Sequence, residues 1–318
     1  MTSQAPRLSF VVVVYAIPRQ AENTLFSLSP AYQRHVRADD YEVIVVENRS
    51  ATLLGEDRVK AAGPNFRYVL RDEPGVSPVR ALNEGVALAR APHVALMIDG
   101  ARLLTPRVVE HALLALRISD RVVVAVPGYH LGKEPQHLAA RAGYDETAEL
   151  ELLERSAWRT DGYALFGVAC FDETNENGFL NPMIESTCLI CSRAAYAETG
   201  GADPRFSSRG GGIVNLDLFD RLCRAPDTTY VVLPGEGAIH QFHGGVTSSS
   251  DGERELRLAD FRAEYEALRG HPYTNHDREP LLVGVIAGQG QPFLHRAADL
   301  GRLRHLMRAK DGQPEWNP

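Results

Sequence analysis

Runs of apolar residues alternate with amphipathic stretches along the first hundred residues of the chain. The strongest run, residues 8–15, contains four consecutive valines and is followed by Pro18, as is typical of a strand buried on both faces of a sheet. The pattern predicts further strands at 41–46, 66–70 and 93–98, and helices at 21–37 and 78–90. This order predicts βαβ units and an α/β fold with a mostly parallel sheet.

The second half of the chain has a less regular pattern. An acidic stretch, 144–159, is expected to be helical, and it is followed by a polar loop at 172–182. Later elements are predicted as strands at 186–192 and 230–233 and as helices at 193–199 and 215–224. From about residue 253 onward the pattern is helical.

Polar residues stand at the ends of three predicted strands. Tyr15 ends the first strand, Glu47 and Asn48 follow the second, and Asp99 follows the strand at 93–98. In open parallel sheets the ligand crevice lies beyond the carboxyl ends of the strands. We therefore expect these side chains to surround one binding site.

The composition is that of a globular protein that does not bind a nucleic-acid polymer. The 318 residues, 44% hydrophobic and 24% charged, suffice for one large α/β domain or two smaller ones. A net charge of −7 argues against a DNA or RNA partner, because neutralising phosphates requires a basic face. A small nucleotide is compatible with this charge.

Two features bear on location. The apolar run at 8–17 is too short to span a bilayer, and its valines favour a buried strand over the core of a signal peptide, so no transmembrane segment is predicted. Cys188 and Cys191 form a single C-x-x-C within an apolar run, which favours buried thiols in a reducing compartment. These observations predict a cytoplasmic protein.

An ordered set of short motifs resembles the family 2 glycosyltransferases. The set comprises 10–15, 43–50, 75–85, 95–100 followed by Pro106, 200–203, and the helix that carries Asp217 and Arg221. The resemblance implies a GT-A fold, a Rossmann-like and mostly parallel central sheet flanked by helices, with a helical C-terminal extension. It implies a GT-A domain at 1–252, with a nucleotide-binding half at about 7–106 and an acceptor half at about 107–252, and an extension at 253–318.

The resemblance also implies a nucleotide-diphosphate sugar as donor and a hydroxyl compound as acceptor. The residues that it implies for donor binding are Tyr15, Glu47, Arg80, Asn83, Asp99 and Gly100. Glu47 stands where the family reads the base, and Arg80 is suited to hold a phosphate or the base. The alternatives are that Glu47 is a loop acid and that Arg80 is a solvated charge.

The metal motif of the family is incomplete here. Asp99-Gly100-Ala101 replaces the usual Asp-x-Asp, which leaves one carboxylate for a divalent cation. The later string that begins at His240 and contains His243 supplies imidazoles, which suit Mn²⁺ better than Mg²⁺. We therefore predict a divalent metal, Mn²⁺ or Mg²⁺, on Asp99, His240 and His243. The alternative is that both histidines are hydrogen-bonded loop residues.

The catalytic base implied by the resemblance is also absent from its usual position. The family's Glu-Asp pair falls on Val214 and Asn215, neither of which can accept a proton at neutral pH. Asp217 is the nearest carboxylate and is the predicted base, with Asp203 and Glu185 as substitutes. The alternative is that Asp217 only caps or pairs within its helix.

Two functions follow from these observations. The first is an active, inverting glycosyltransferase. The second is a catalytically degenerate relative that binds a nucleotide sugar and acts as a regulatory or scaffold protein, as the missing acids at Ala101 and Asn215 suggest.

The helix predicted at 294–308 is amphipathic and basic. Its leucines are expected to pack on the domain or to form a homodimer. The alternative is contact with an anionic membrane, which would make the protein membrane-peripheral.

Overall fold

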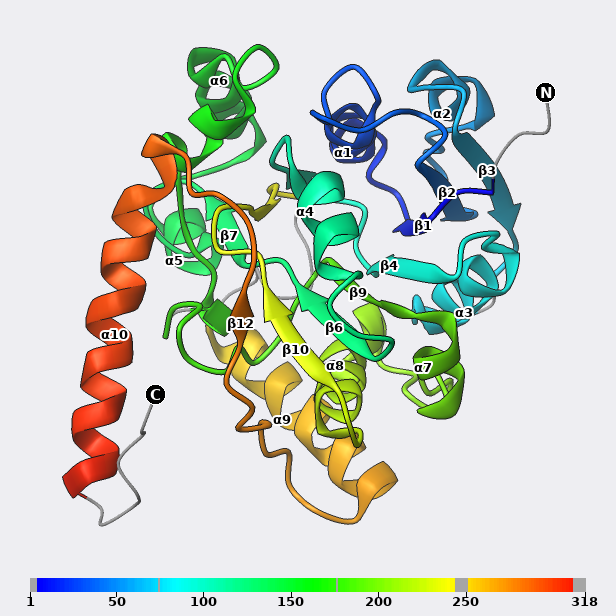
Figure 1. The fold of residues 1–318 in the computed structure, drawn as a ribbon. Coiled ribbons are helices and arrows are strands. Elements are labelled where there is room, and N and C mark those ends of the chain that lie inside the picture. Colours follow the sequence, from blue (N-terminus) through cyan, green and yellow to red (C-terminus); the bar gives the residue numbers. More distant parts are fainter. Residues whose placement is uncertain (1–4, 74, 176, 244–250, 311–318) are drawn as a thin grey trace.

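The computed structural model describes residues 5–73, 75–175, 177–243 and 251–310. These residues form a mixed α/β fold with an eight-stranded sheet and a smaller four-stranded sheet (Figure 1). The strand order across the large sheet is β12-β10-β6-β9-β4-β1-β2-β3, and β9 is antiparallel to both of its neighbours while the other pairs are parallel. The predicted α/β fold with a mostly parallel central sheet is confirmed.

The large sheet contains every strand predicted from the sequence. Its strands are β1 (Leu8–Val14), β2 (Tyr41–Asn48), β3 (Phe66–Arg71), β4 (His93–Met97), β6 (Val122–Ala125), β9 (Leu189–Ser192), β10 (Thr229–Val232) and β12 (Leu281–Leu282). β1 lies near the middle, between β4 and β2, where both of its faces are covered. This position explains its run of valines, because a central parallel strand has no solvent-facing side.

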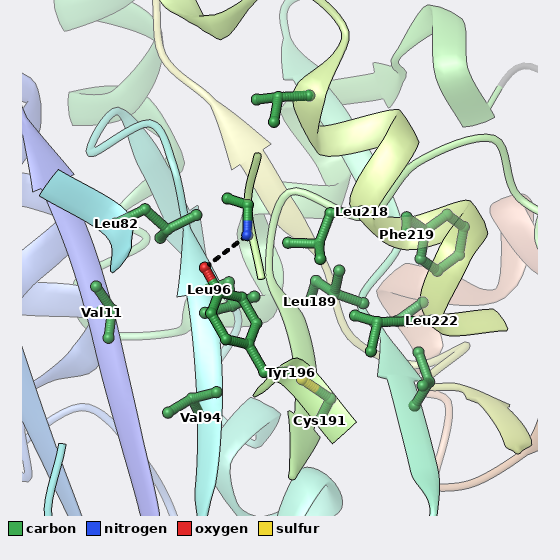
Figure 2. Close-up of a cluster of buried hydrophobic side chains, with 14 of the residues drawn as sticks. Val11, Leu82, Val94, Leu96, Leu189, Cys191, Tyr196, Leu218, Phe219 and Leu222 are labelled. Carbon is green, nitrogen blue, oxygen red and sulfur yellow. Dashed lines mark hydrogen bonds between the residues drawn. The ribbon is translucent and has the colours of Figure 1, made fainter. Parts of the chain in front are cut away.

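Helices cover both faces of the large sheet. Phe10, Val12 and Val14 of β1 join the core formed with α1 (Pro18–Leu28), α2 (Glu56–Ala61) and α4 (Val108–Ala115). Val11 and Val13 point to the opposite core, formed with α3 (Val79–Leu88), α7 (Arg193–Glu198) and α8 (Val214–Arg224). Figure 2 shows this second core, where Leu218 and Leu222 of α8 pack near Leu189 of the sheet.

Gly85 of α3 allows the helix to lie against β1, because a Cβ at this position would be 2.2 Å from Val11 Cγ1. We expect Gly85→Ala to lower the free energy of unfolding by about 1–3 kcal/mol through overpacking. Gly301, on α10 (Gln291–Lys310), is the matched control, since a Cβ there would meet Leu180 at an ordinary 3.5 Å. Gly301→Ala should be neutral or stabilising by up to about 1 kcal/mol. Urea denaturation checks both variants, and equal stabilities would contradict the packing argument.

The helix predicted at 21–37 is wrong in its second half. The observed α1 starts at Pro18 and ends at Leu28. Pro30 disfavours the helical conformation of the preceding residue, and Ser29 is accordingly extended with ψ of 151°. The chain then turns, with the amides of Tyr32 and Gln33 donating to the Ser29 carbonyl, before it reaches β2.

The smaller sheet brings two distant segments of the chain together. Its order is β5 (Arg102–Leu104), β11 (Ala238–His240), β7 (Gly128–Leu131) and β8 (Ala169–Phe171). β5 and β11 are antiparallel, and Arg102 lies opposite His240 in their register. The sheet therefore places the histidine string beside the segment that follows Asp99. Two helices, α5 (Gln136–Arg141) and α6 (Glu146–Ser156), lie between β7 and β8 in the sequence.

The C-terminal part is helical, as predicted, except for a segment that returns to the large sheet. α9 (Asp251–Arg269) and α10 are separated by β12, which is parallel to β10. The first half of α10 packs through Ala297, which is fully buried, whereas Leu303 and Leu306 are each 48% exposed. Figure 1 shows α10 at the β12 side of the molecule, opposite β3. Dimerisation and membrane contact through this helix stay predictions.

Among the described residues, no helix combines the length and the apolar character needed to cross a bilayer.

Candidate functional site

Asp99 stands directly beyond the carboxyl end of β4, in a turn held close to β1. A Cβ on Gly100 would lie 2.8 Å from the Val13 carbonyl oxygen, so only glycine permits this approach. The Gly100 carbonyl accepts a hydrogen bond of 2.8 Å from Thr24 of α1. The amide of Ala101 donates to Asp99 Oδ1 at 3.0 Å, which leaves Oδ2 facing away from the turn.

The two histidines predicted as metal ligands both lie at Asp99. His240 Nε2 is 3.1 Å and His243 Nε2 is 3.7 Å from Asp99 Oδ2, and the two Nε2 atoms are 2.9 Å apart. Ligand atoms on one cation with bonds of about 2.1 Å lie roughly 3 Å from each other. The three side chains thus have the spacing of a metal site, and the donor set of one carboxylate and two imidazoles fits Mn²⁺ better than Mg²⁺.

The protonation of this cluster follows from its burial together with the charges that its members exert on one another. Burial lowers the pKa of His240 well below its usual range, and the charge of Arg102 acts in the same direction. Burial alone would raise the pKa of Asp99, but His243 and His240 hold it well below its usual range. Burial would also lower the pKa of His243, but the charge of Asp99 raises it. Asp99 is therefore ionised, and His240 is neutral with a lone pair for a ligand.

Arg102 lies beside the same cluster, and its guanidinium group is not fully hydrogen-bonded. Its Nε is 3.5 Å from Asp99 Oδ2, and its Nη1 is 4.0 Å from Asp172 Oδ2. Both nitrogens are buried and make no hydrogen bond with any described residue. A buried guanidinium with unused donors fits a charged ligand with several oxygens. Arg102 was not among the predicted site residues, because its place at the cluster depends on the pairing of β5 with β11.

A pocket of about 390 Å³ opens beside the cluster. It is lined by residues 16–20 at the start of α1, by Glu146, by Phe242 and by His243. Arg19 is one of the lining residues. Its guanidinium group donates to the Phe242 carbonyl at 3.2 Å and to the Glu149 carboxylate at 3.3 Å. Burial raises the pKa of Glu149 to about 7. Tyr15, predicted to contact the nucleotide, is 56% exposed and precedes the residues of this pocket.

Glu47 is fully buried at the end of β2. Its carboxylate accepts hydrogen bonds from the amides of Leu54 and Gly55, at 2.7 and 3.1 Å, and from the Tyr68 hydroxyl at 2.7 Å. These bonds fold the loop after β2. Base recognition by Glu47 stays a prediction, and a direct contact would require some of these bonds to break.

Arg80 and Asn83 of α3 lie near the segment 202–207, but in different environments. Asn83 donates to the Ala202 carbonyl at 2.8 Å and accepts from the Tyr196 hydroxyl, so its side chain holds that segment. Arg80 is exposed, lines a second pocket of about 260 Å³ with Val76 and Phe206, and has no hydrogen bond or ion pair among the described residues. Arg80 therefore has its guanidinium donors available for a ligand, whereas Asn83 already uses its oxygen and one of its two amide N–H groups.

Asp217, the predicted base, lies in a buried ion network instead of an open cleft. It is 1% exposed, and its two oxygens accept hydrogen bonds from Arg221 and Arg269 at 2.6–2.9 Å. Arg269, on α9, also donates to Asp203 at 2.8 Å. Both oxygens of Asp217 are therefore occupied by guanidinium groups. A substrate hydroxyl could reach this carboxylate only if some of these bonds broke, and Asp217 as the base stays a prediction.

Glu185, named above as a substitute base, lies in the segment before β9, which is antiparallel to β4 and pairs Leu189 with Leu96. Asn215, at the start of α8, donates to its Oε1 at 2.5 Å. Burial raises the pKa of Glu185, and the charges of Arg102, Asp172 and Asp99 also act on it. The residue that replaces the family's acid therefore holds another acid beside the site.

No family model matches the chain, and no curated protein matches it. Among solved structures the chain is similar to the mannosyltransferase PcManGT from Pyrobaculum calidifontis in complex with GDP-Man and Mn²⁺. The match covers 98% of this chain and 77% of that chain, with 15% sequence identity and a TM-score of 0.51. The chain is also similar to S. aureus TarS 1-349 in complex with UDP-GlcNAc, at 12% identity, over 92% of this chain and 72% of that chain, with a TM-score of 0.51.

The chain has a GT-A-like fold. This result confirms the fold class implied by the resemblance.

Proposed function

We propose that the protein is a family 2-like glycosyltransferase that moves a sugar from a nucleotide-diphosphate sugar to a hydroxyl acceptor, with inversion and with a divalent metal. The observation that carries the proposal is the meeting of Asp99, His240 and His243 at the carboxyl end of β4. The fold, shared with proteins whose structures contain GDP-Man and Mn²⁺ or UDP-GlcNAc, supports it.

In this proposal Asp99, His240 and His243 hold the cation. A bound cation would stabilise the charge that develops on the departing diphosphate. Arg102, with its unused buried nitrogens, would bind diphosphate oxygens from below. The pocket at residues 16–20, which shares His243 with the cluster, is the proposed place for part of the donor.

A panel of nucleotide-diphosphate sugars, each tested with Mn²⁺, Mg²⁺ or chelator in a thermal-shift assay, tests the proposal. A ligand at 100 times its dissociation constant stabilises the folded state by about 2.7 kcal/mol. We expect one nucleotide class to raise the melting temperature by several degrees with Mn²⁺, less with Mg²⁺ and least with chelator. No response to any donor would contradict the proposal.

The alternative is a degenerate protein that binds the donor but does not transfer the sugar. Ala101, fully buried in place of a second acid, supports it. Release of nucleoside diphosphate from the donor identified in the panel separates the two functions. Steady release removes the alternative, and tight binding without release over hours favours it.

A further inference from the structure

Glu185 is held firmly at the edge of the Asp99 cluster. Glu185 lies in the segment that precedes β9. Asn215 donates to Glu185 Oε1 at 2.5 Å and to the Ser186 carbonyl at 3.2 Å. Asn275 donates to the Met183 carbonyl at 3.2 Å from the opposite side. The backbone of this segment is therefore tied to two separate parts of the chain, and the position of the carboxylate is fixed.

The second oxygen of Glu185 is unused. Among the described residues Oε2 accepts no hydrogen bond, and the side chain is partly exposed. The charges that act on Glu185 are those of Arg102, Asp172 and Asp99. β9 is antiparallel to β4 with Leu189 opposite Leu96, so the continuation of the two strands brings Glu185 and Asp99 to the same end of the sheet.

The other acids around the site are each paired with a cationic side chain. The pairs are Asp172 with Arg102, Glu173 with Arg254, Asp203 with Arg205 and Arg269, Asp217 with Arg221 and Arg269, and Glu149 with Arg19. A guanidinium group beside each of these carboxylates competes with an acceptor hydroxyl for it. Glu149, whose pKa is raised to about 7 by burial, also accepts a hydrogen bond from the Phe242 amide. Glu185 has no ion pair among the described residues, and its hydrogen-bond partner is a neutral amide.

We propose that Glu185 is the general base of the transfer reaction. This inference rests on the proposed function. The acceptor oxygen attacks the anomeric carbon, and the bond from that carbon to the diphosphate oxygen breaks. Its electron pair leaves with the nucleoside diphosphate, and the acceptor proton moves to Glu185 Oε2. With water as acceptor the same steps give free sugar and nucleoside diphosphate.

Glu185→Gln tests the assignment in the full-length protein, because the amide cannot accept the proton. Release of nucleoside diphosphate from the donor found in the thermal-shift panel, with water as acceptor, gives kcat. Titration calorimetry with Mn²⁺ and the same nucleoside diphosphate gives the dissociation constant. We expect kcat to fall by at least about 100-fold and the dissociation constant to change by less than about threefold.

Two further variants control the result. Glu134→Gln makes the same chemical change at an exposed position and should leave both quantities unchanged. Glu185→Asp keeps a carboxylate one methylene further back and should retain more turnover than Glu185→Gln. A Glu185→Gln protein that binds the nucleotide and keeps kcat within about threefold would overturn the assignment alone. A wild-type protein that neither binds nor turns over any donor would overturn the proposed function, and the assignment with it.

Discussion

Asp99→Ala is expected to remove metal-dependent donor binding and to lower turnover by about 10³-fold. Asp99 Oδ2 is the anionic atom that both His240 and His243 approach, so the alanine variant leaves two neutral or partly charged imidazoles to hold a cation. Metal stabilisation of a departing charge contributes several kcal/mol, and about 4 kcal/mol corresponds to 10³-fold in rate. The measurement is the release of nucleoside diphosphate with Mn²⁺ present.

The control for this variant is a distant exposed acid. Asp72, whose side chain is 80% exposed and pairs with Arg49, is replaced by alanine and should retain wild-type turnover. The melting temperature without metal or nucleotide shows whether the Asp99 variant is folded. Full turnover in a folded Asp99→Ala protein would remove the cluster from the mechanism.

Asp217→Asn is expected to destabilise the protein instead of acting only on catalysis. The change removes the negative charge between Arg221 and Arg269 at a site that is 1% exposed, and it weakens the link between α8 and α9. Breaking a buried ion pair by removing one partner costs about 3–5 kcal/mol. Because both arginines retain some exposure, we expect the free energy of unfolding to fall by an amount near the lower limit, about 3 kcal/mol. Urea denaturation measures this change, and the m-value should stay the same.

Asp260→Asn, an exposed position on α9, is the matched control and should stay within about 0.5 kcal/mol of the wild type. Unchanged stability in Asp217→Asn, together with a large loss of turnover, would restore Asp217 as the base and contradict the structural role.

Six of the eight strands of the large sheet could be predicted from the sequence because their signals are local, whereas β6 and β12 were missed. The four valines of β1 are buried on both faces, and such a run suits few positions other than the interior of a parallel sheet. The end of α1 was missed because apolar periodicity continues past Leu28, although Pro30 stops the helix. The return of β12 to the sheet was also missed, since a two-residue strand of Leu281 and Leu282 has no periodicity to detect.

Only those site residues that stand in recognisable sequence motifs could be predicted from the sequence. The order of strands placed Asp99 at a carboxyl end, and the histidine string suggested a partner for it. Arg102 was missed because its importance depends on the pairing of β5 with β11, which no local pattern encodes. Asp217 was chosen by its spacing along the helix, whereas Arg269, which occupies its carboxylate, comes from α9, 52 residues later.

Anomalous diffraction at the manganese edge, from crystals grown with Mn²⁺ and the nucleoside diphosphate selected by the thermal-shift panel, tests whether Asp99, His240 and His243 hold a metal. We expect one anomalous peak bonded to Asp99, His240 Nε2 and His243 Nε2 at about 2.1–2.3 Å, with diphosphate oxygens completing the coordination and Arg102 beside them. A bound nucleotide with no anomalous peak at these three side chains, or with manganese held elsewhere, would contradict it.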